Sequence, residues 1–328
     1  MIISKTPLRV SFTGGGSDLS AYYAVRAGAV TSVTVNQYMY VTVNRRFDDT
    51  VRLSYSTTEI VGHRDELRHE IAREAMRIVG LESGVEITTI ADVPAGTGLG
   101  SSSSLSVGLL NALYAFTGRH ASADRLAREA CRLEIDVLRK PIGKQDQYAA
   151  AFGGMNHFRF HPDESVFVEP VISAPGTKAA LQDRLLMFYT GLRGDNTGLL
   201  DAQRAETSRS VDKRRILDRM VELAGLLREA LSRDDLADFG ALLHENWELK
   251  KRMAAGITNP EVDRWYEIAR AEGALGGKIL GAGGSGFLLL YCEEARQPRL
   301  RAALGEAGLR EFSFRFESQG SRIIYVGD

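Results

Sequence analysis

Glycine and serine are concentrated directly in front of an apolar segment, where a phosphate group could bind. The stretch VPAGTGLGSSSSLSVGLLNALYAF, residues 93–116, places three glycines and four consecutive serines before a nearly all-apolar run. A helix N-terminus leaves about four backbone N–H groups unpaired and carries about half a positive charge. Glycines let the backbone fold closely around an anion, and serine hydroxyls donate to phosphate or bind magnesium. The stretch predicts a phosphate-binding loop before a buried helix; the alternative is a flexible loop with an N-cap.

Two better-known phosphate motifs do not fit the chain. A Walker loop needs lysine and then serine or threonine after its last glycine; no lysine follows Gly100, and Ile279 follows Lys278. The run TGGGSDL, residues 13–19, follows a predicted strand as a dinucleotide fingerprint would. However, Leu19 stands where that fingerprint requires its third glycine. The phosphate site is therefore of another kind.

Carboxylates and a cation suited to chemistry lie in other segments. Glu134 falls on a predicted helix, and Asp146 follows a turn that contains Pro141 and Gly143. Arg9 lies in a short apolar strand, where an unpaired charge is costly, so we expect it to have a partner. The alternatives are a solvated carboxylate for Glu134 and a helix-capping role for Asp146. A second glycine-rich loop precedes a buried strand within residues 276–292, or forms only a tight turn.

The elements that must position these residues are mixed helices and strands. Strands are predicted from apolar, β-branched and alternating runs at 8–12, 29–47, 51–56, 84–94, 155–172 (a hairpin), 181–192, 287–292, 312–317 and 321–326. Helices are predicted from helical apolar spacing at 66–79, 106–116, 122–138, 197–255 (long charged helices), 261–273 and 297–307. The lack of regular βαβα alternation indicates an α+β fold. Near residues 175–185 the sequence changes from strand-rich segments to long charged helical segments, which predicts two domains, 1–180 and 181–328.

Composition excludes some classes of protein. The chain has 328 residues, 44% hydrophobic and 25% charged, with a net charge of −1, so we expect neither a nucleic-acid partner nor an anionic membrane partner. We see no signal peptide and no apolar run near the length of a membrane span. Cys131 and Cys292 have no metal-site spacing and are expected to be buried thiols. We therefore expect a cytoplasmic protein; the sequence predicts no oligomeric state.

Three motifs in order resemble one enzyme family. PAGTGLGSSSS, residues 94–104, resembles the signature P-x-x-x-G-L-G-S-S of the galactokinase, homoserine kinase, mevalonate kinase and phosphomevalonate kinase (GHMP) superfamily. TPLRVSFTGGGSD, residues 6–18, is similar to its first motif, and GAGGSGF, residues 281–287, to its third. The resemblance implies the two-domain α+β GHMP kinase fold with the active site in the inter-domain cleft. It also implies that the hydroxyl of a small molecule is phosphorylated by ATP with Mg²⁺.

The resemblance also implies roles for individual residues. Asp146 would accept or orient the proton of the attacking hydroxyl, and Arg9 would polarise that hydroxyl or stabilise the Asp146 carboxylate. Ser102 and Glu134 would bind magnesium. The residues that would hold ATP are Pro94, Gly96, Thr97, Gly98, Leu99, Gly100, Ser101, Ser102 and Ser103.

The substrate is suggested by a closer resemblance. TGGGSD, residues 13–18, departs from galactokinases and is similar to the fucokinase-like and heptose-phosphate kinase branch. Residues 132–154 and 257–287 resemble bacterial D-glycero-D-manno-heptose 7-phosphate kinases, which phosphorylate the anomeric hydroxyl on the way to nucleotide-activated heptose. The alternatives are a fucokinase-like or other sugar kinase, an isoprenoid-pathway kinase and a non-catalytic small-molecule-binding protein of the same fold.

A sugar phosphate needs hydroxyl-binding groups and cations in the acceptor half of the cleft. Asp18 aligns with the aspartate that binds sugar hydroxyls, and a phosphate favours arginine or lysine. Lys5 and Arg193 are the predicted phosphate-binding cations; the alternative is that both are surface charges. The other predicted acceptor-binding residues are Gly15, Gly16, Ser17, Gly283 and Gly284.

Overall fold

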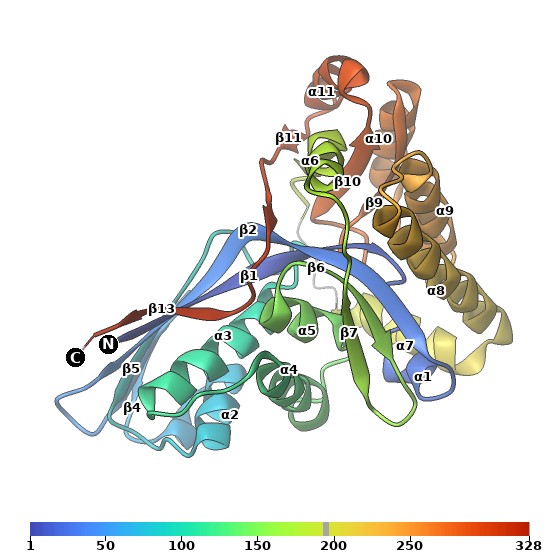
Figure 1. Ribbon diagram of the computed structural model, residues 1–328. Coiled ribbons are helices and arrows are strands. Elements are labelled where there is room, and N and C mark those ends of the chain that lie inside the picture. Colours follow the sequence, from blue (N-terminus) through green and yellow to red (C-terminus); the bar gives the residue numbers. More distant parts are fainter. Residues whose placement is uncertain (193–196, 328) are drawn as a thin grey trace.

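Two β-sheets organise the molecule (Figure 1). The computed structural model describes residues 1–192 and 197–327. The larger sheet contains β1 (Ile2–Thr13), β2 (Gly28–Arg45), β3 (Val51–Ser54), β4 (Thr58–Val61), β5 (Val85–Ala91), β6 (Met155–Phe160), β7 (Val166–Pro170), β12 (Phe316–Glu317) and β13 (Arg322–Val326). The smaller sheet has the order β11 (Arg310–Glu311), β8 (Leu185–Tyr189), β10 (Phe287–Cys292) and β9 (Ala274–Ile279).

The long strand β2 holds the larger sheet together. It pairs antiparallel with β1 along most of its length, with β6 through residues 28–33 and with β5 through residues 39–45. β6 and β5 therefore pair with the same edge of β2, β6 beside its first residues and β5 beside its last. The run predicted at 29–47 forms one continuous strand, Gly28–Arg45, whose valines and threonines are buried almost without interruption.

Four helices cover one face of the larger sheet: α2 (Glu70–Val79), α3 (Ser101–Phe116), α4 (Ala123–Cys131) and α5 (Gln145–Phe152). The central one is α3, which packs on β1 and β2 and buries nearly every side chain, as its all-apolar sequence predicted. It begins at Ser101 rather than at residue 106, so the serines form its first turn. A π-helical segment (Arg132–Val137) follows α4 directly and carries Glu134.

The remaining helices surround the smaller sheet or lie against the other face of the larger one (Figure 1). They are the short α1 (Ser20–Tyr23), α6 (Pro175–Arg184), α7 (Thr197–Arg209), α8 (Val211–Ser232), α9 (Phe239–Lys251), α10 (Pro260–Ala271) and α11 (Gln297–Glu306). Short 3₁₀ turns lie at Arg64–Glu66 and Glu294–Arg296. The long helices predicted within 197–255 are confirmed as α7, α8 and α9. The strand predicted at 181–192 is wrong in its first part, since α6 runs to Arg184 behind Pro175 at its first turn.

The end of the chain returns to the larger sheet. β12 pairs with β2 and β13 with β1, and the amino terminus of Met1 donates to the carbonyl of Gly327 at 3.3 Å. Two strands from beyond residue 180, β12 and β13, thus belong to the sheet that the first half of the chain forms. The domain boundary at residue 180 stays a prediction. The α+β fold itself is confirmed. No helix in the described part of the chain is long and apolar enough to cross a membrane, and both cysteines are buried and free.

Candidate active site

A buried ion pair lies where β1, the glycine loop and α5 meet. Arg9 donates from Nε to Oδ1 of Asp146 at 2.7 Å and from Nη2 to Oδ2 at 2.8 Å. The side chain of Arg9 is only 6% exposed, whereas that of Asp146 is 23% exposed. This two-pronged geometry is the strong form of an arginine–carboxylate pair and fixes the plane of the carboxylate. The partner expected for Arg9 is thus Asp146, whose remaining exposed edge faces a cavity.

Arg9 also holds the glycine loop. Its Nη1 donates to the carbonyl of Gly98, and its backbone N–H donates to the carbonyl of Leu99 at 3.0 Å. Gly98 has φ +86°, and a Cβ there would overlap the carbonyl oxygen of Leu280 in the second glycine-rich loop. Only glycine permits this approach. The two glycine-rich loops predicted from sequence therefore lie backbone against backbone.

The N-terminus of α3 is arranged to receive an anion. Its N-cap is Gly100, in the left-handed conformation with φ 78°, and no side chain caps the helix. The first N–H groups of a helix have no partner within it, so those of Ser101 to Ser103 are suited to phosphate oxygens. Thr97 Oγ1 donates to the carbonyl of Pro94 at 2.9 Å and closes the loop upstream, around Gly96. The predicted ATP-binding residues are thus one continuous segment that ends on this helix.

Ser102 and Glu134 meet beside that helix end. Ser102 Oγ donates to Oε2 of Glu134 at 2.7 Å, and Gln147 Nε2 donates to Oε1 at 3.1 Å. Glu134 is fully buried, and the Nζ of Lys140 lies 3.2 Å from its Oε2 and 3.1 Å from Ser102 Oγ. A buried carboxylate requires a cation, and Lys140 supplies one here.

These oxygens also fit Mg²⁺. No cluster of three or more histidine, cysteine, aspartate or glutamate residues suited to a metal exists among the described residues. A single carboxylate and a hydroxyl suit Mg²⁺, which keeps several waters and is often bound through substrate phosphates. Ser102 and Glu134 would be its protein ligands.

A cavity of about 150 Å³ opens next to Asp146 and is lined from both halves of the chain. Residues from the first half include Arg9, Ser11, Gly15, Gly16, Asp18, Gln145 and Asp146. Residues from the second half include Leu200, Gln203, Lys250, Lys278, Gly281 and Ala282. The prediction of a site between two halves therefore agrees with where this cavity lies.

Asp18 is a structural anchor of this cavity. Its Oδ1 accepts from the N–H of Gly16 at 2.9 Å and its Oδ2 from the N–H of Gln145 at 3.2 Å. The side chain is buried, and burial, with the nearby charge of Asp146, raises the pKa of Asp18. The carboxylate thereby ties the first glycine motif to the start of α5.

Several polar atoms of the cavity wall make no hydrogen bond within the described part of the protein. They are Ser11 Oγ, Gln145 Oε1 and Gln203 Nε2. Unpaired buried polar atoms are costly and rare. Such a wall is suited to a ligand with many hydroxyl groups.

Two buried lysines in the cavity were missed by the sequence analysis. Lys250 Nζ donates to Gln203 Oε1 at 2.7 Å, and Lys278 Nζ donates to the carbonyl of Phe12 at 3.2 Å. Burial lowers the pKa of Lys250 to about 8 and, with the neighbouring Lys250 and Arg9, that of Lys278 to about 7. The available signals were weak: Lys278 interrupts an apolar strand, and Lys250 continues the buried face of α9.

Other predicted acceptor residues lie outside the cavity. Lys5 stacks over the Tyr38 ring at 3.7 Å from the ring centre and is not among the lining residues. Ser17 is fully buried, and its hydroxyl closes the preceding turn by donating to Gly14 and Ala29 carbonyls. Gly283 and Gly284 pack against residues 256–257 instead. Arg193 lies outside the described residues.

The buried lysines predict a pH dependence of stability. Between pH 7.5 and 9, Lys278 is mostly neutral when folded and protonated when unfolded, so the unfolded state binds more protons. The free energy of unfolding should therefore rise with pH, with a contribution of up to about 1.4 kcal/mol per pH unit from this residue. Lys278→Met should flatten the slope relative to wild type in urea titrations. Lys178→Met, an exposed site on α6, is the control; equal slopes in all three proteins would contradict the assignment.

Comparison with known proteins agrees with this geometry. Residues 66–154 match the description "GHMP kinases N terminal domain" and residues 227–309 match "GHMP kinases C terminal". The chain is 28% identical to D-glycero-alpha-D-manno-heptose 7-phosphate kinase of Campylobacter jejuni, over 95% of this chain and 96% of that protein. It is 26% identical to bifunctional fucokinase/GDP-fucose pyrophosphorylase of Arabidopsis thaliana, over 92% of this chain but 31% of that protein.

A solved structure extends the likeness to the whole fold. The crystal structure of a D-glycero-D-manno-heptose 1-phosphate kinase from Bacteriodes thetaiotaomicron superposes with a TM-score of 0.82 at 25% identity, covering 100% of both chains. The two matched regions, the order of the motifs and the overall fold therefore all indicate the same family. The chain belongs to the GHMP kinase family and is an ATP-dependent kinase.

Proposed function

We propose that the protein transfers the γ-phosphoryl group of ATP to the anomeric hydroxyl of D-glycero-D-manno-heptose 7-phosphate, giving the 1,7-bisphosphate and ADP. The observation that carries the proposal is the acceptor cavity beside Asp146, whose unpaired polar atoms suit a sugar. The Campylobacter jejuni relative, matched over 96% of its length, is named D-glycero-alpha-D-manno-heptose 7-phosphate kinase, which supports this substrate. The product is a sugar 1-phosphate, which a nucleotidyl transferase activates, and we place the reaction in the cytoplasm, where ATP is made.

The proposed reaction is an in-line displacement at phosphorus. The anomeric oxygen forms a bond to the γ-phosphorus, and the bond from that phosphorus to the bridging oxygen of ADP breaks. Asp146 orients the hydroxyl and accepts its proton, while Arg9 holds the carboxylate in plane through two hydrogen bonds. Phosphoryl transfer depends mainly on positioning and charge neutralisation, which these two residues provide on the acceptor side.

The donor side is the glycine loop with α3. Backbone N–H groups of residues 96–103 bind the triphosphate at the helix N-terminus. Ser102 and Glu134 would hold Mg²⁺, which would supply neutralisation of phosphoryl charge. Lys140, whose Nζ contacts both of these oxygens, places a cation beside the proposed phosphate site.

A substrate panel tests the proposal. Heptose 7-phosphate, unphosphorylated heptose, mannose, fucose, galactose and mevalonate are each incubated with Mg-ATP, and ADP release is measured. Heptose 7-phosphate should give the highest kcat/KM. Better turnover of fucose would favour a fucokinase, which the 26% identity to the plant enzyme supports as the second candidate, and no sugar-dependent ADP release at all would favour a binding protein.

Asp146→Asn should lower kcat by roughly 10²- to 10⁴-fold, because asparagine cannot accept the proton. The KM for ATP should change little, since the Asp146 carboxylate lies beside Gly100 but forms its hydrogen bonds with Arg9 and not with the N–H groups of the α3 N-terminus. Steady-state kinetics with both substrates check this. Asp163→Asn, at an exposed turn between β6 and β7, is the control, and wild-type turnover in Asp146→Asn would remove the residue from the mechanism.

Glu134→Gln should raise the Mg²⁺ concentration needed for half-maximal activity, since a neutral amide is a weaker ligand for a hard cation. Gln147→Ala, which removes a hydrogen bond to Glu134 without removing charge, should have a smaller effect. Activity is titrated with Mg²⁺ at fixed ATP. An unchanged Mg²⁺ requirement in Glu134→Gln would place the metal elsewhere.

A further inference from the structure

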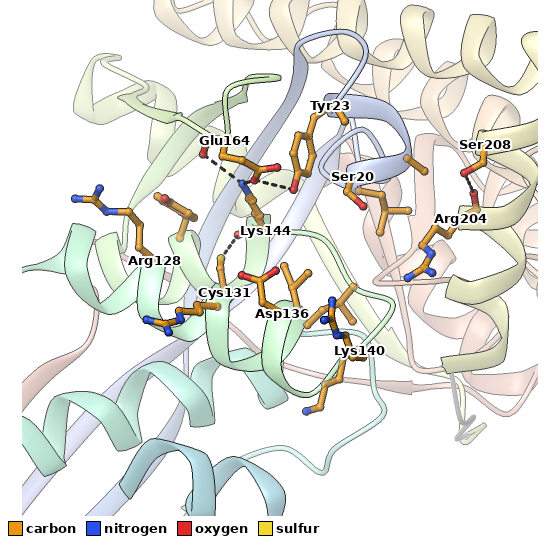
Figure 2. A pocket seen from close by; sticks show the side chains of 18 residues that line it. Ser20, Tyr23, Arg128, Cys131, Asp136, Lys140, Lys144, Glu164, Arg204 and Ser208 are labelled. Atoms are coloured by element: carbon orange, nitrogen blue, oxygen red, sulfur yellow. Dashed lines mark hydrogen bonds and ion pairs between the residues drawn. The ribbon is translucent and has the colours of Figure 1, made fainter. Parts of the chain in front are cut away.

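A second and larger cavity, of about 920 Å³, lies beside the acceptor cavity (Figure 2). Its wall is strongly basic, since six lysines and arginines line it against two carboxylates. They are Arg128, Arg132, Arg139, Lys140, Lys144 and Arg204, with Asp136 and Glu164. None of the phosphate-loop residues 94–103 is among its described lining residues. Of the six cations, Lys140 contacts Ser102 and Glu134, so the cavity borders the phosphate loop. The remaining basic residues give the wall an excess of positive charge that suits a second anion.

The two cavities share a wall. Leu19 and Ile142 line both of them. At three places, residues one or two positions apart in sequence line different cavities. Asp18, Gly143 and Gln203 line the acceptor cavity, whereas Ser20, Lys144 and Arg204 line the basic cavity. The two cavities are therefore neighbours, separated by Leu19 and Ile142.

Some of the basic residues already have partners. Lys144 pairs with Glu164 and lies over the Tyr23 ring, Lys140 pairs with Glu134, and Arg128 pairs with Asp124. Figure 2 shows the Lys144, Glu164 and Tyr23 group at one end of the cavity, away from Arg204. These residues have little remaining capacity to neutralise a dianion.

Three lining arginines, Arg132, Arg139 and Arg204, make no ion pair with another described residue. Of these, Arg139 and Arg204 lie nearest in sequence to the shared wall, three residues before Ile142 and directly after Gln203. Arg139 has φ 56°, an unusual backbone conformation for a residue other than glycine, in the loop that leads from the π-helical segment to Ile142. Arg204 lies on α7 and lines the cavity (Figure 2). Each guanidinium carries parallel N–H donors that match the oxygens of a phosphate.

We propose that the basic cavity holds the phosphate at the far end of the acceptor sugar, with Arg139 and Arg204 as its main ligands. The proposal rests on the proposed function, because a sugar that carries no second phosphate has no group for this site. The anomeric end lies against Asp146, and the chain of carbons passes Leu19 and Ile142. The site replaces Lys5, which lies over Tyr38 outside both cavities.

The test is a double variant, Arg139→Gln with Arg204→Gln. Loss of charged hydrogen bonds should raise the KM for heptose 7-phosphate roughly 10- to 100-fold. The KM for ATP and the kcat/KM for unphosphorylated heptose should stay within about twofold. Inorganic phosphate, used as a competitive inhibitor against heptose 7-phosphate, should inhibit the variant much more weakly than the wild type. Arg209→Gln, on α7 but outside the cavity lining, is the matched control and should behave as wild type.

The outcomes separate this inference from the proposed function. If wild type shows no preference for phosphorylated over unphosphorylated heptose, the proposed function is wrong and this site with it. If wild type has the preference and the double variant keeps it, the function stands and the phosphate binds elsewhere. A raised KM for ATP with an unchanged KM for the sugar phosphate would assign the cavity to the nucleotide and overturn the inference. Unchanged circular dichroism and thermal unfolding verify that the variant is folded.

Discussion

The ion pair between Arg9 and Asp146 is the interaction on which the site depends. A guanidinium that is 6% exposed is stable only with a well-placed partner. The same side chain and its backbone also bind the carbonyls of Gly98 and Leu99. One residue thereby fixes the glycine loop, the first strand and the start of α5 in a single arrangement. The phosphate-binding loop and the carboxylate of Asp146 are therefore held next to each other by the hydrogen bonds of one buried arginine.

The second half of the chain completes this arrangement through glycine and lysine. The backbone of residues 280–281 lies against Gly98, so the position of the phosphate loop depends on both halves. Lys250 and Lys278 bring positive charge close to Asp18, whose burial is otherwise unfavourable. Burial disfavours the charged form of all three groups, raising the pKa of Asp18 and lowering the pKa values of Lys250 and Lys278.

The motif residues could be predicted from the sequence because their function requires unusual residue types at short range. Glycines at positive φ, serines at a helix N-terminus and an arginine in an apolar strand each conflict with local preference, and the conflict is visible in the sequence. Lys250 and Lys278 could not be predicted in this way, because their burial depends on packing between distant elements. Lys5 was placed in the site by its closeness to the motif in sequence. It lies four positions before Arg9 on an extended strand, however, which places the two residues roughly 13 Å apart.

The return of the chain to its first sheet has a consequence for how the molecule is built. β13 pairs with β1, and the amino terminus meets Gly327. A ribosome makes β13 after every other described element, so the edge of β1 that pairs with β13 stays without its neighbouring strand until then.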